Sequence, residues 1–270
     1  MSIDEWLKNT STELADAMIP SARLDAEIIL SHTLNKPRTW LHAHGDDEID
    51  TRRNDIANAR AELRLERVPI AYIIGHKYFY GRRFTVSPAT LIPRPESEDC
   101  IDLAKMLLSD RTAPLHIVDV GTGSGCLGIT AGLELPTYDL CLSDTSKDAL
   151  RVAEKNAIYH GLTPQIISSN LLDSYPLKAD LVLANLPYVD ESWPHISPEL
   201  DYEPHDALYA KKAGLACIFE LLQQLPQKLT ARGIAIVEAD PVQHQRIIAE
   251  AVSHQLCHVK THGFALALTL

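Results

Sequence analysis

Four consecutive residues, Asn185-Leu186-Pro187-Tyr188, combine groups that could activate a planar NH2 nitrogen. Such a nitrogen, in an amide or an aromatic amine, is a poor nucleophile because its lone pair is delocalised. The side-chain oxygen of Asn185 and the backbone carbonyl of Leu186 could accept both N–H hydrogens and localise the lone pair toward an electrophile. Pro187 would stiffen the turn, and Tyr188 could pack on the planar group. The four residues therefore predict an acceptor site for group transfer to nitrogen.

A second cluster lies upstream, where Gly121-Thr122-Gly123-Ser124-Gly125 follows an apolar run. Glycines let the backbone approach a ligand closely, and the N-terminus of a following helix offers free N–H groups. Asp144 lies about where an acid that binds ribose hydroxyls is expected, and Asn170 could hydrogen-bond an adenine edge. The spacing from Gly123 to Gly128 also fits the dinucleotide fingerprint, so the glycines alone leave a nicotinamide enzyme open. No acid–base pair suited to hydride chemistry accompanies them.

The elements that must hold both clusters alternate between strand and helix from residue 115 onward. Apolar runs predict strands at 115–120, 138–144, 165–167, 181–184, 234–238 and 264–268. Helices are expected at 126–133, 147–160, 214–225 and 242–254, after an earlier one that ends near 108. Repeated β-α units of this kind form a doubly wound sheet that binds ligands at the carboxyl ends of its strands. The sequence thus predicts an α/β fold in which both clusters meet at one sheet edge.

The first 67 residues carry no strand pattern and predict a small helical domain that begins with a capping box at Ser2 and Glu5. A hairpin-like connector at 68–92 and the α/β domain at 93–270 are expected to follow. In the helix expected from about 51 to 67, an apolar stripe should be buried, formed by Ile56, Ala59 and Leu63. Another face should be either solvated or a docking surface for an acidic partner, and it carries Arg53, Arg60, Arg64 and Arg67.

The composition is that of a globular chain. With 270 residues, 46% of them hydrophobic, it can form one large domain and a smaller one. The net charge of −11 argues against broad binding to a phosphate backbone. The five cysteines are scattered and the histidine pairs lack a third ligand, so neither disulfides nor a metal site are expected. No long apolar span or signal-peptide pattern occurs, which predicts a cytoplasmic protein that does not enter a membrane.

Further motifs follow one another in a fixed order at 23–28, 69–75, 91–98, 119–125 and 202–208. Over nearly the whole chain they resemble the HemK-type release-factor glutamine methyltransferases. The resemblance implies a helical domain joined to a Rossmann-like methyltransferase domain that methylates the glutamine of the Gly-Gly-Gln loop in class 1 peptide chain release factors. It implies that S-adenosylmethionine is held by Asp119, Gly121, Thr122, Gly123, Gly125, Asp144, Asn170 and Asn185. The glutamine amide would be held by Asn185, Leu186, Pro187 and Tyr188.

Leu186 stands where that family usually has a first proline, and Asn-Leu-Pro-Tyr is also the form found in ribosomal RNA adenine dimethyltransferases. An adenine N6-methyltransferase for RNA or DNA therefore stays open, as do a glutamine methyltransferase for a ribosomal protein and a non-catalytic S-adenosylmethionine binder. Charge favours a protein substrate, because residues 188–209 contain several acids and no Lys or Arg. A nucleic-acid enzyme should surround a flipped base with cations and stacking groups. Late in the chain, residues 238–241 are looser than the family's usual pattern.

Overall fold

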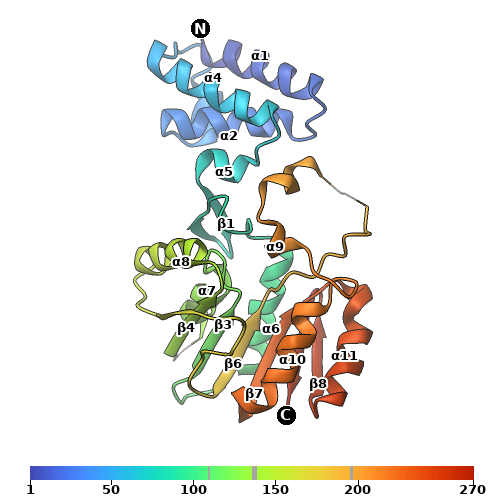
Figure 1. The fold of residues 1–270 in the computed structure, drawn as a ribbon. Helices are drawn as coiled ribbons and strands as arrows, with labels where there is room; N and C mark the ends of the chain where they lie inside the picture. The colour runs from blue at the N-terminus through green and yellow to red at the C-terminus, as the bar shows by residue number, and fades with distance from the viewer. Residues whose placement is uncertain (109, 136–138, 195–196) are drawn as a thin grey trace. The chain divides into compact units, whose positions relative to one another are not determined.

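The computed structural model describes residues 1–108, 110–135, 139–194 and 197–270 (Figure 1). This part of the chain forms two compact units. The first contains Met1–Gly75 and the short segment Ser197–Tyr202, and the second contains the remainder. Each unit has its own hydrophobic core.

The first unit is helical. Its elements are α1 (Ile3–Asp16), α2 (Ala22–Leu34), α3 (Arg38–Ala43), α4 (Thr51–Leu65), α5 (Ile70–Ile74) and the 3-10 helix η2 (Pro198–Tyr202). The predicted capping box is confirmed, because the Ser2 side chain accepts from the Glu5 N–H while the Glu5 side chain accepts from the Ser2 N–H. Residues 70–74 were expected in a hairpin-like segment, and that expectation is wrong for them. They form a helix between Pro69 and Gly75, whose φ of 73° suits a helix end.

Helix α4 buries small residues rather than the stripe expected from the sequence. Ile56, Ala59 and Leu63 are exposed, so that prediction is wrong. Ala57 and Ala61 are buried instead, and α4 packs against α2. Small side chains allow two helix backbones to approach closely, which explains why this face, and not the more apolar one, lies in the core.

The arginines of this segment do not share a solvated face, so the predicted docking surface is wrong. Arg64 is buried, and its guanidinium lies 2.7 Å from Asp25 Oδ2 and 2.9 Å from Glu199 Oε1. Arg67 donates to the Ala17 carbonyl at 2.6 Å, and Arg60 donates to the Thr33 hydroxyl at 2.7 Å. Three of the four arginines, Arg60, Arg64 and Arg67, therefore hold the helical unit together.

In the second unit, the described residues form a seven-stranded sheet in the order β5-β4-β3-β6-β7-β9-β8 (Figure 1). The strands are β3 (His116–Val120), β4 (Asp139–Asp144), β5 (Gln165–Ser168), β6 (Ala179–Ala184), β7 (Leu229–Glu238), β8 (Cys257–His262) and β9 (Ala265–Thr269). Neighbours from β5 to β7 are parallel, and β9 is antiparallel to both β7 and β8. The expected α/β fold is confirmed, although Tyr138, at the predicted start of the second strand, lies outside the described residues.

Helices and a hairpin complete this unit. They are β1 (His76–Phe79) paired with β2 (Arg82–Thr85), η1 (Pro95–Ser97), α6 (Glu98–Leu108), α7 (Cys126–Glu134), α8 (Lys147–Tyr159), α9 (His205–Leu208), α10 (Ala216–Lys228), η3 (Pro241–Gln243) and α11 (His244–Ser253). The hairpin matches the expectation for that part of the connector. Strand order reverses between β3 and β6, and such a switch point leaves a crevice beyond the carboxyl ends of the strands.

Alternate strand residues enter two separate cores. On β6, Val182 and Ala184 enter the core that contains residues of α10 and α11, whereas Leu181 and Leu183 enter the core that contains residues of α6, α7 and α8. This period of two follows from the pleat of a strand. On β3 and β7 the same alternation puts Asp119 beside Ile117 and Glu238 beside Ile236, on the α6 and α7 face.

Candidate active site

A cavity of about 350 Å³ is lined by residues that directly follow β3, β4, β5 and β6. Its volume lies in the range of sites for small-molecule ligands. The sequence-predicted site residues on its wall are Asp119, Gly121, Thr122, Gly123, Asp144, Asn170, Asn185, Leu186 and Pro187. Gly125 and Tyr188 do not line it. Asp206, one of the acids expected beside the acceptor site, also lies on this wall. Sequence reasoning assigned no role in the site to residues 89–91, Pro93, Ala207 and Cys217, which also line it.

Asp119, the fourth of the five residues of strand β3, anchors the glycine-rich turn. Its Oδ2 accepts from the Thr122 hydroxyl at 2.6 Å and from the Gly128 N–H at 2.9 Å. Burial raises the pKa of this carboxyl to about 6, against the lowering effect of those two hydrogen bonds. The other oxygen, Oδ1, has no hydrogen-bond partner among the described residues. A buried acceptor beside the cavity fits a ligand that carries positive charge.

Asp144 is the last residue of β4, and Asn170 lies two residues after the end of β5. One oxygen of Asp144 accepts from the Gly123 N–H at 2.9 Å, and the other accepts from the Ser146 N–H at 2.8 Å. Each carboxylate oxygen keeps a second lone pair, so both can also accept from a ligand hydroxyl. The Asn170 amide donates to Glu220 Oε1 at 2.8 Å, which leaves its side-chain oxygen and one N–H for a ligand.

The charge of the cavity wall separates the two cofactor classes left open by the glycines. Within the described ranges the wall contains Asp119, Asp144 and Asp206, and no Lys or Arg. A dinucleotide would bring a pyrophosphate close to these carboxylates, whereas S-adenosylmethionine brings a sulfonium and an ammonium group. The residues present therefore fit S-adenosylmethionine better than a nicotinamide dinucleotide.

The Asn185 side chain follows β6 in a fixed orientation. Its Nδ2 donates to the Ser97 Oγ at 2.9 Å, and no described residue donates to its Oδ1. Ser97 is buried at the end of η1, in a segment whose functional role the sequence did not reveal. The Asn185 oxygen is thus available to accept a hydrogen bond from a ligand at the cavity wall.

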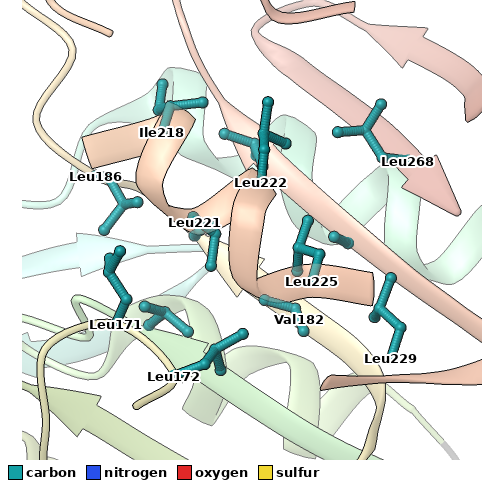
Figure 2. Close-up of a cluster of buried hydrophobic side chains, with 14 of the residues drawn as sticks. Leu171, Leu172, Val182, Leu186, Ile218, Leu221, Leu222, Leu225, Leu229 and Leu268 are labelled. Atoms are coloured by element: carbon teal, nitrogen blue, oxygen red, sulfur yellow. The ribbon is translucent and has the colours of Figure 1, made fainter. Parts of the chain in front are cut away.

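Leu186 joins the two clusters found in the sequence. Its side chain is buried in the core under α10, near Ile218 and Leu221 (Figure 2). A Cβ added to Gly121 would lie 2.9 Å from Leu186 Cδ2, and Gly121 has a φ of 67°. Glycine is therefore required at 121 both for its backbone conformation and for the space that Leu186 occupies.

Tyr188 is held from two sides by residues that sequence reasoning missed. Its hydroxyl donates to Glu238 Oε1 at 3.1 Å, and its carbonyl accepts from Gln243 Nε2 at 2.8 Å. A Cβ at Gly214 would lie 1.9 Å from the Tyr188 carbonyl oxygen, so the loop before α10 packs directly on this backbone. The sequence signals for Glu238 are its place at the end of an apolar strand and at the start of the segment 238–241. Burial, together with the carboxyl group of Glu238, raises the pKa of Tyr188.

Two acids of the segment after Tyr188 are neutralised within their own units. Glu203 is buried and accepts from Arg94 and from the Ile92 N–H, which ties the segment to residues 92–94. Glu199 pairs with Arg64 in the helical unit.

Over the described ranges, no helix is long and apolar enough to cross a membrane. In the same ranges, no group of three metal-ligating side chains is found.

Known protein families match both parts of the chain. Residues 5–75 match the PrmC N-terminal domain, and residues 97–197 match the methyltransferase small domain. A methyltransferase from Pyrococcus furiosus, 14% identical, covers 78% of this chain and 95% of its own at a TM-score of 0.52. A 16S rRNA N2 G1207 methyltransferase from T. Thermophilus in complex with AdoMet and guanosine, 13% identical, covers 72% of this chain and 49% of its own at a TM-score of 0.52. These two structures share the fold.

Similar curated proteins cover most of the chain. A release factor glutamine methyltransferase of Neisseria gonorrhoeae is 33% identical over 88% of this chain and 84% of its own length. One of Koribacter versatilis is 35% identical over 90% of this chain and 89% of its own. The methyltransferase domain makes S-adenosylmethionine the methyl donor. The chain therefore belongs to the release factor glutamine methyltransferase family.

Proposed function

We propose that this protein transfers a methyl group from S-adenosylmethionine to the side-chain amide nitrogen, N5, of a glutamine in the Gly-Gly-Gln loop of a class 1 peptide chain release factor. The names of its relatives support this substrate. The observation that carries the proposal is the orientation of the Asn185 amide. Its NH2 group donates to Ser97, so its oxygen is free to accept a hydrogen bond at the cavity wall.

The acceptor residues act on the lone pair of the glutamine nitrogen. The Asn185 oxygen and the Leu186 carbonyl accept its two N–H hydrogens, while Pro187 stiffens the turn and the Tyr188 ring packs on the amide plane. Positioning of this kind supplies most of the acceleration in a displacement that needs no strong general base. The nitrogen becomes acidic once it is methylated, and its proton then leaves to solvent.

The donor residues bind and orient S-adenosylmethionine, which supplies an electrophilic methyl group. They are Asp119, Gly121, Thr122, Gly123, Gly125, Asp144 and Asn170, with Asn185 at the boundary to the acceptor site. Asp144 accepts from the ribose hydroxyls, and Asp119 provides negative charge near the cationic part of the donor.

Methylation of adenine N6 is the second candidate, because an adenine NH2 fits the same pair of acceptors. The wall of the cavity, as far as the structure describes it, has no Lys or Arg to hold a nucleic-acid backbone, which favours the protein substrate. A glutamine of a ribosomal protein would undergo the same chemistry. Site geometry therefore does not distinguish this alternative from the release factor, and only a test of the two substrates does. A release factor as substrate also implies that the protein acts in the cytoplasm.

The test is incubation with methyl-labelled S-adenosylmethionine and, separately, a purified class 1 release factor, ribosomal proteins and total RNA. We expect label in the release factor, and mass spectrometry should find one added methyl group on the glutamine of the Gly-Gly-Gln peptide. A release factor with glutamate in place of that glutamine is the matched control and should stay unlabelled. Label in RNA or ribosomal protein alone would contradict the proposal, and a protein inert toward all three would support a non-catalytic binder.

A further inference from the structure

Gln243 is a buried residue of η3 that the proposed reaction does not use. The residue is 3% exposed, and it does not line the cavity. Its Nε2 donates to two backbone carbonyls, that of Tyr188 at 2.8 Å and that of Ala213 at 3.1 Å. One side-chain amide therefore joins the last residue of the acceptor motif, residues 185–188, to the loop before α10.

The orientation of this amide is fixed by a third partner. The Asp240 N–H donates to Gln243 Oε1 at 3.3 Å, as part of a capping box at the start of η3. A glutamine amide has one acceptor oxygen and an NH2 group with two hydrogens. Because the oxygen faces Asp240, the NH2 group faces the two carbonyls, and each of its hydrogens has an acceptor. A flipped amide would place its oxygen against both carbonyl oxygens, so the side chain holds the two loops in one arrangement only.

The loop that Gln243 contacts has a strained backbone. Lys212, Ala213 and Gly214 have left-handed φ angles of 60°, 58° and 80°. This conformation is unfavourable for a residue that carries a Cβ, and it persists only where the surroundings hold it. The hydrogen bond from Gln243 to the Ala213 carbonyl is one such restraint. The strained turn 212–214 is therefore held in part by the same amide that holds Tyr188.

This turn packs on the backbone of the acceptor motif. Gly214 lies so close to Tyr188 that an added Cβ would overlap the Tyr188 carbonyl oxygen. The next residue, Val189, is held by the preceding segment, because its N–H donates to the Leu208 carbonyl at 3.0 Å and its carbonyl accepts from the Ala210 N–H at 3.1 Å. The Tyr188 carbonyl and the residue after it are thus both restrained, and this fixes the backbone from which the Tyr188 ring projects.

We propose that Gln243 is a positioning residue that holds the Tyr188 end of the acceptor motif in place by tying it to the strained turn 212–214. The inference rests on the proposed function, in which the Tyr188 ring packs on the amide plane of the substrate glutamine. The side-chain hydrogen bonds of Gln243 go to Asp240, Tyr188 and Ala213, and none of these residues is on the donor side. Loss of Gln243 should therefore lower turnover more than affinity for S-adenosylmethionine.

Two substitutions of Gln243 test this role directly. Gln243→Met keeps a similar volume but donates no hydrogen bond, and we expect turnover to fall at least about tenfold while affinity for S-adenosylmethionine, measured by calorimetry, stays within about twofold. Gln243→Glu keeps the acceptor for the Asp240 N–H, but its ionised carboxylate would face the two carbonyl oxygens, so turnover should fall at least as far. Wild-type turnover in Gln243→Met, or an equal loss of donor affinity, would overturn the inference.

A second pair of variants disturbs the same contact without changing Gln243. Gly214→Ala puts a methyl group against the Tyr188 carbonyl, and we expect turnover to fall at least about tenfold with donor affinity retained. Gly161→Ala is the matched control, because Gly161 has a similar φ of 77° and an added Cβ there would meet nothing within 4 Å. Turnover of this control should stay within about twofold of wild type. Equal turnover in the two alanine variants would overturn the inference, and thermal unfolding checks that both are folded.

Ala213→Gly tests whether the strain in the turn matters. Glycine adopts a left-handed φ without the cost of a Cβ, so the turn should keep its conformation more easily without the hydrogen bond from Gln243. We expect Ala213→Gly in the Gln243→Met background to be at least about threefold more active than Gln243→Met alone. A double variant no more active than Gln243→Met would overturn the link between the strained turn and Tyr188.

A further readout does not depend on the substrate. In protein labelled with 15N glutamine, Gln243→Glu identifies the side-chain NH2 resonances of Gln243. Because both hydrogens are bonded and buried, we expect them to exchange with solvent at least about tenfold more slowly than those of the exposed Gln165. A wild-type protein that is inert toward release factor would refute the proposed function, while fast exchange at Gln243 would refute the role of Gln243.

Discussion

Two buried carboxyl groups lie near the carboxyl ends of strands on the same face of the sheet, Asp119 on β3 and Glu238 on β7, but different parts of the chain surround them. Asp119 accepts from Thr122 and Gly128, three and nine residues away. Glu238 accepts from Tyr188, 50 residues away. Burial raises the pKa of the first to about 6 and of the second to about 7. The contacts of Asp119 lie within one local loop, whereas the contact of Glu238 with Tyr188 forms only when segments distant in the chain pack together.

This difference separates the site into two parts that should respond separately to mutation. Asp119 shapes the turn whose glycines and N–H groups face the cavity, so it belongs to the proposed donor side. Glu238 accepts a hydrogen bond from Tyr188, so it belongs to the proposed acceptor side. A variant on the donor side should therefore change mainly the affinity for S-adenosylmethionine, and a variant on the acceptor side should change mainly the turnover.

Asn185→Ala should have the largest effect. It removes one of the two acceptors for the substrate nitrogen, and we expect turnover to fall about 100- to 1,000-fold. Donor affinity, measured by calorimetry, should fall no more than about fivefold, because Asn185 lies at the boundary between the two sides. Asn170→Ala is the matched control on the donor side and should weaken donor binding more than turnover. Equal losses in both quantities for Asn185→Ala would show that the two parts are not separable.

The titration of Asp119 and of Glu238 should each contribute to the pH dependence of the free energy of unfolding. Each has a folded-state pKa above its ordinary value, 3.8 for Asp119 and 4.5 for Glu238. The stabilisation from retaining the proton is complete below those ordinary values and is lost as the pH rises through about 6 for Asp119 and about 7 for Glu238. The free energy of unfolding of the wild type should therefore fall over this range, by up to about 3 kcal/mol per group.

Asp119→Asn and Glu238→Gln should each reduce the decrease in the free energy of unfolding with rising pH. The pH ranges over which the two variants differ from wild type should lie about one pH unit apart. Denaturant unfolding from pH 4 to 8 measures the effect. Asp148→Asn is the control, because this carboxylate is 69% exposed and pairs with Arg151 at the surface. A Glu238→Gln variant with the wild-type slope would show that Glu238 does not hold its proton in the folded state.

Asp119→Asn should also weaken donor binding. It removes the negative charge of a carboxyl group whose Oδ1 has no protein partner, and we expect affinity for S-adenosylmethionine to fall about tenfold to thirtyfold. Turnover at saturating donor should stay within about threefold. In Glu238→Gln, the matched change on the acceptor side, donor affinity should stay within about twofold. Loss of acceptor turnover in Asp119→Asn at saturating donor would contradict the separation.

The same contrast explains how much of the site could be predicted from the sequence. The glycine turn and Asp144 were predictable from the residues, and Asp119 from the family resemblance, because their partners lie within one β-α unit or at its neighbouring strand end. Ser97, Glu238 and Gln243 received no role, because their contacts with Asn185 and Tyr188 arise only from the packing of η1, β7 and η3. The α/β alternation itself is local, and most of the expected strands and helices match, although β7 begins at Leu229, five residues before the expected start.

In the helical unit the prediction failed for a related reason. Helical periodicity identified two faces of α4 but not which one is buried. The arginine face looked solvated because the partners of Arg64, which are Asp25 and Glu199, lie far away in the chain. Paired charges and alanines could therefore occupy the core while Ile56 and Leu63 stayed exposed.

Leu186→Pro should have the smallest effect, and it tests the residue at which the donor and acceptor sides meet. The Leu186 N–H has no hydrogen-bond acceptor in the described part of the chain, so proline removes no such bond. Its carbonyl, the proposed second acceptor, is retained, and we expect turnover within about threefold of wild type. The shorter ring leaves space beside Gly121 and under α10, which should cost about 1 kcal/mol of stability. Leu186→Ala lacks the restricted φ of proline and should lose more, about 2 to 4 kcal/mol. A tenfold loss of turnover in Leu186→Pro with unchanged stability would mean that leucine acts on the chemistry and not only on the packing between the two sides.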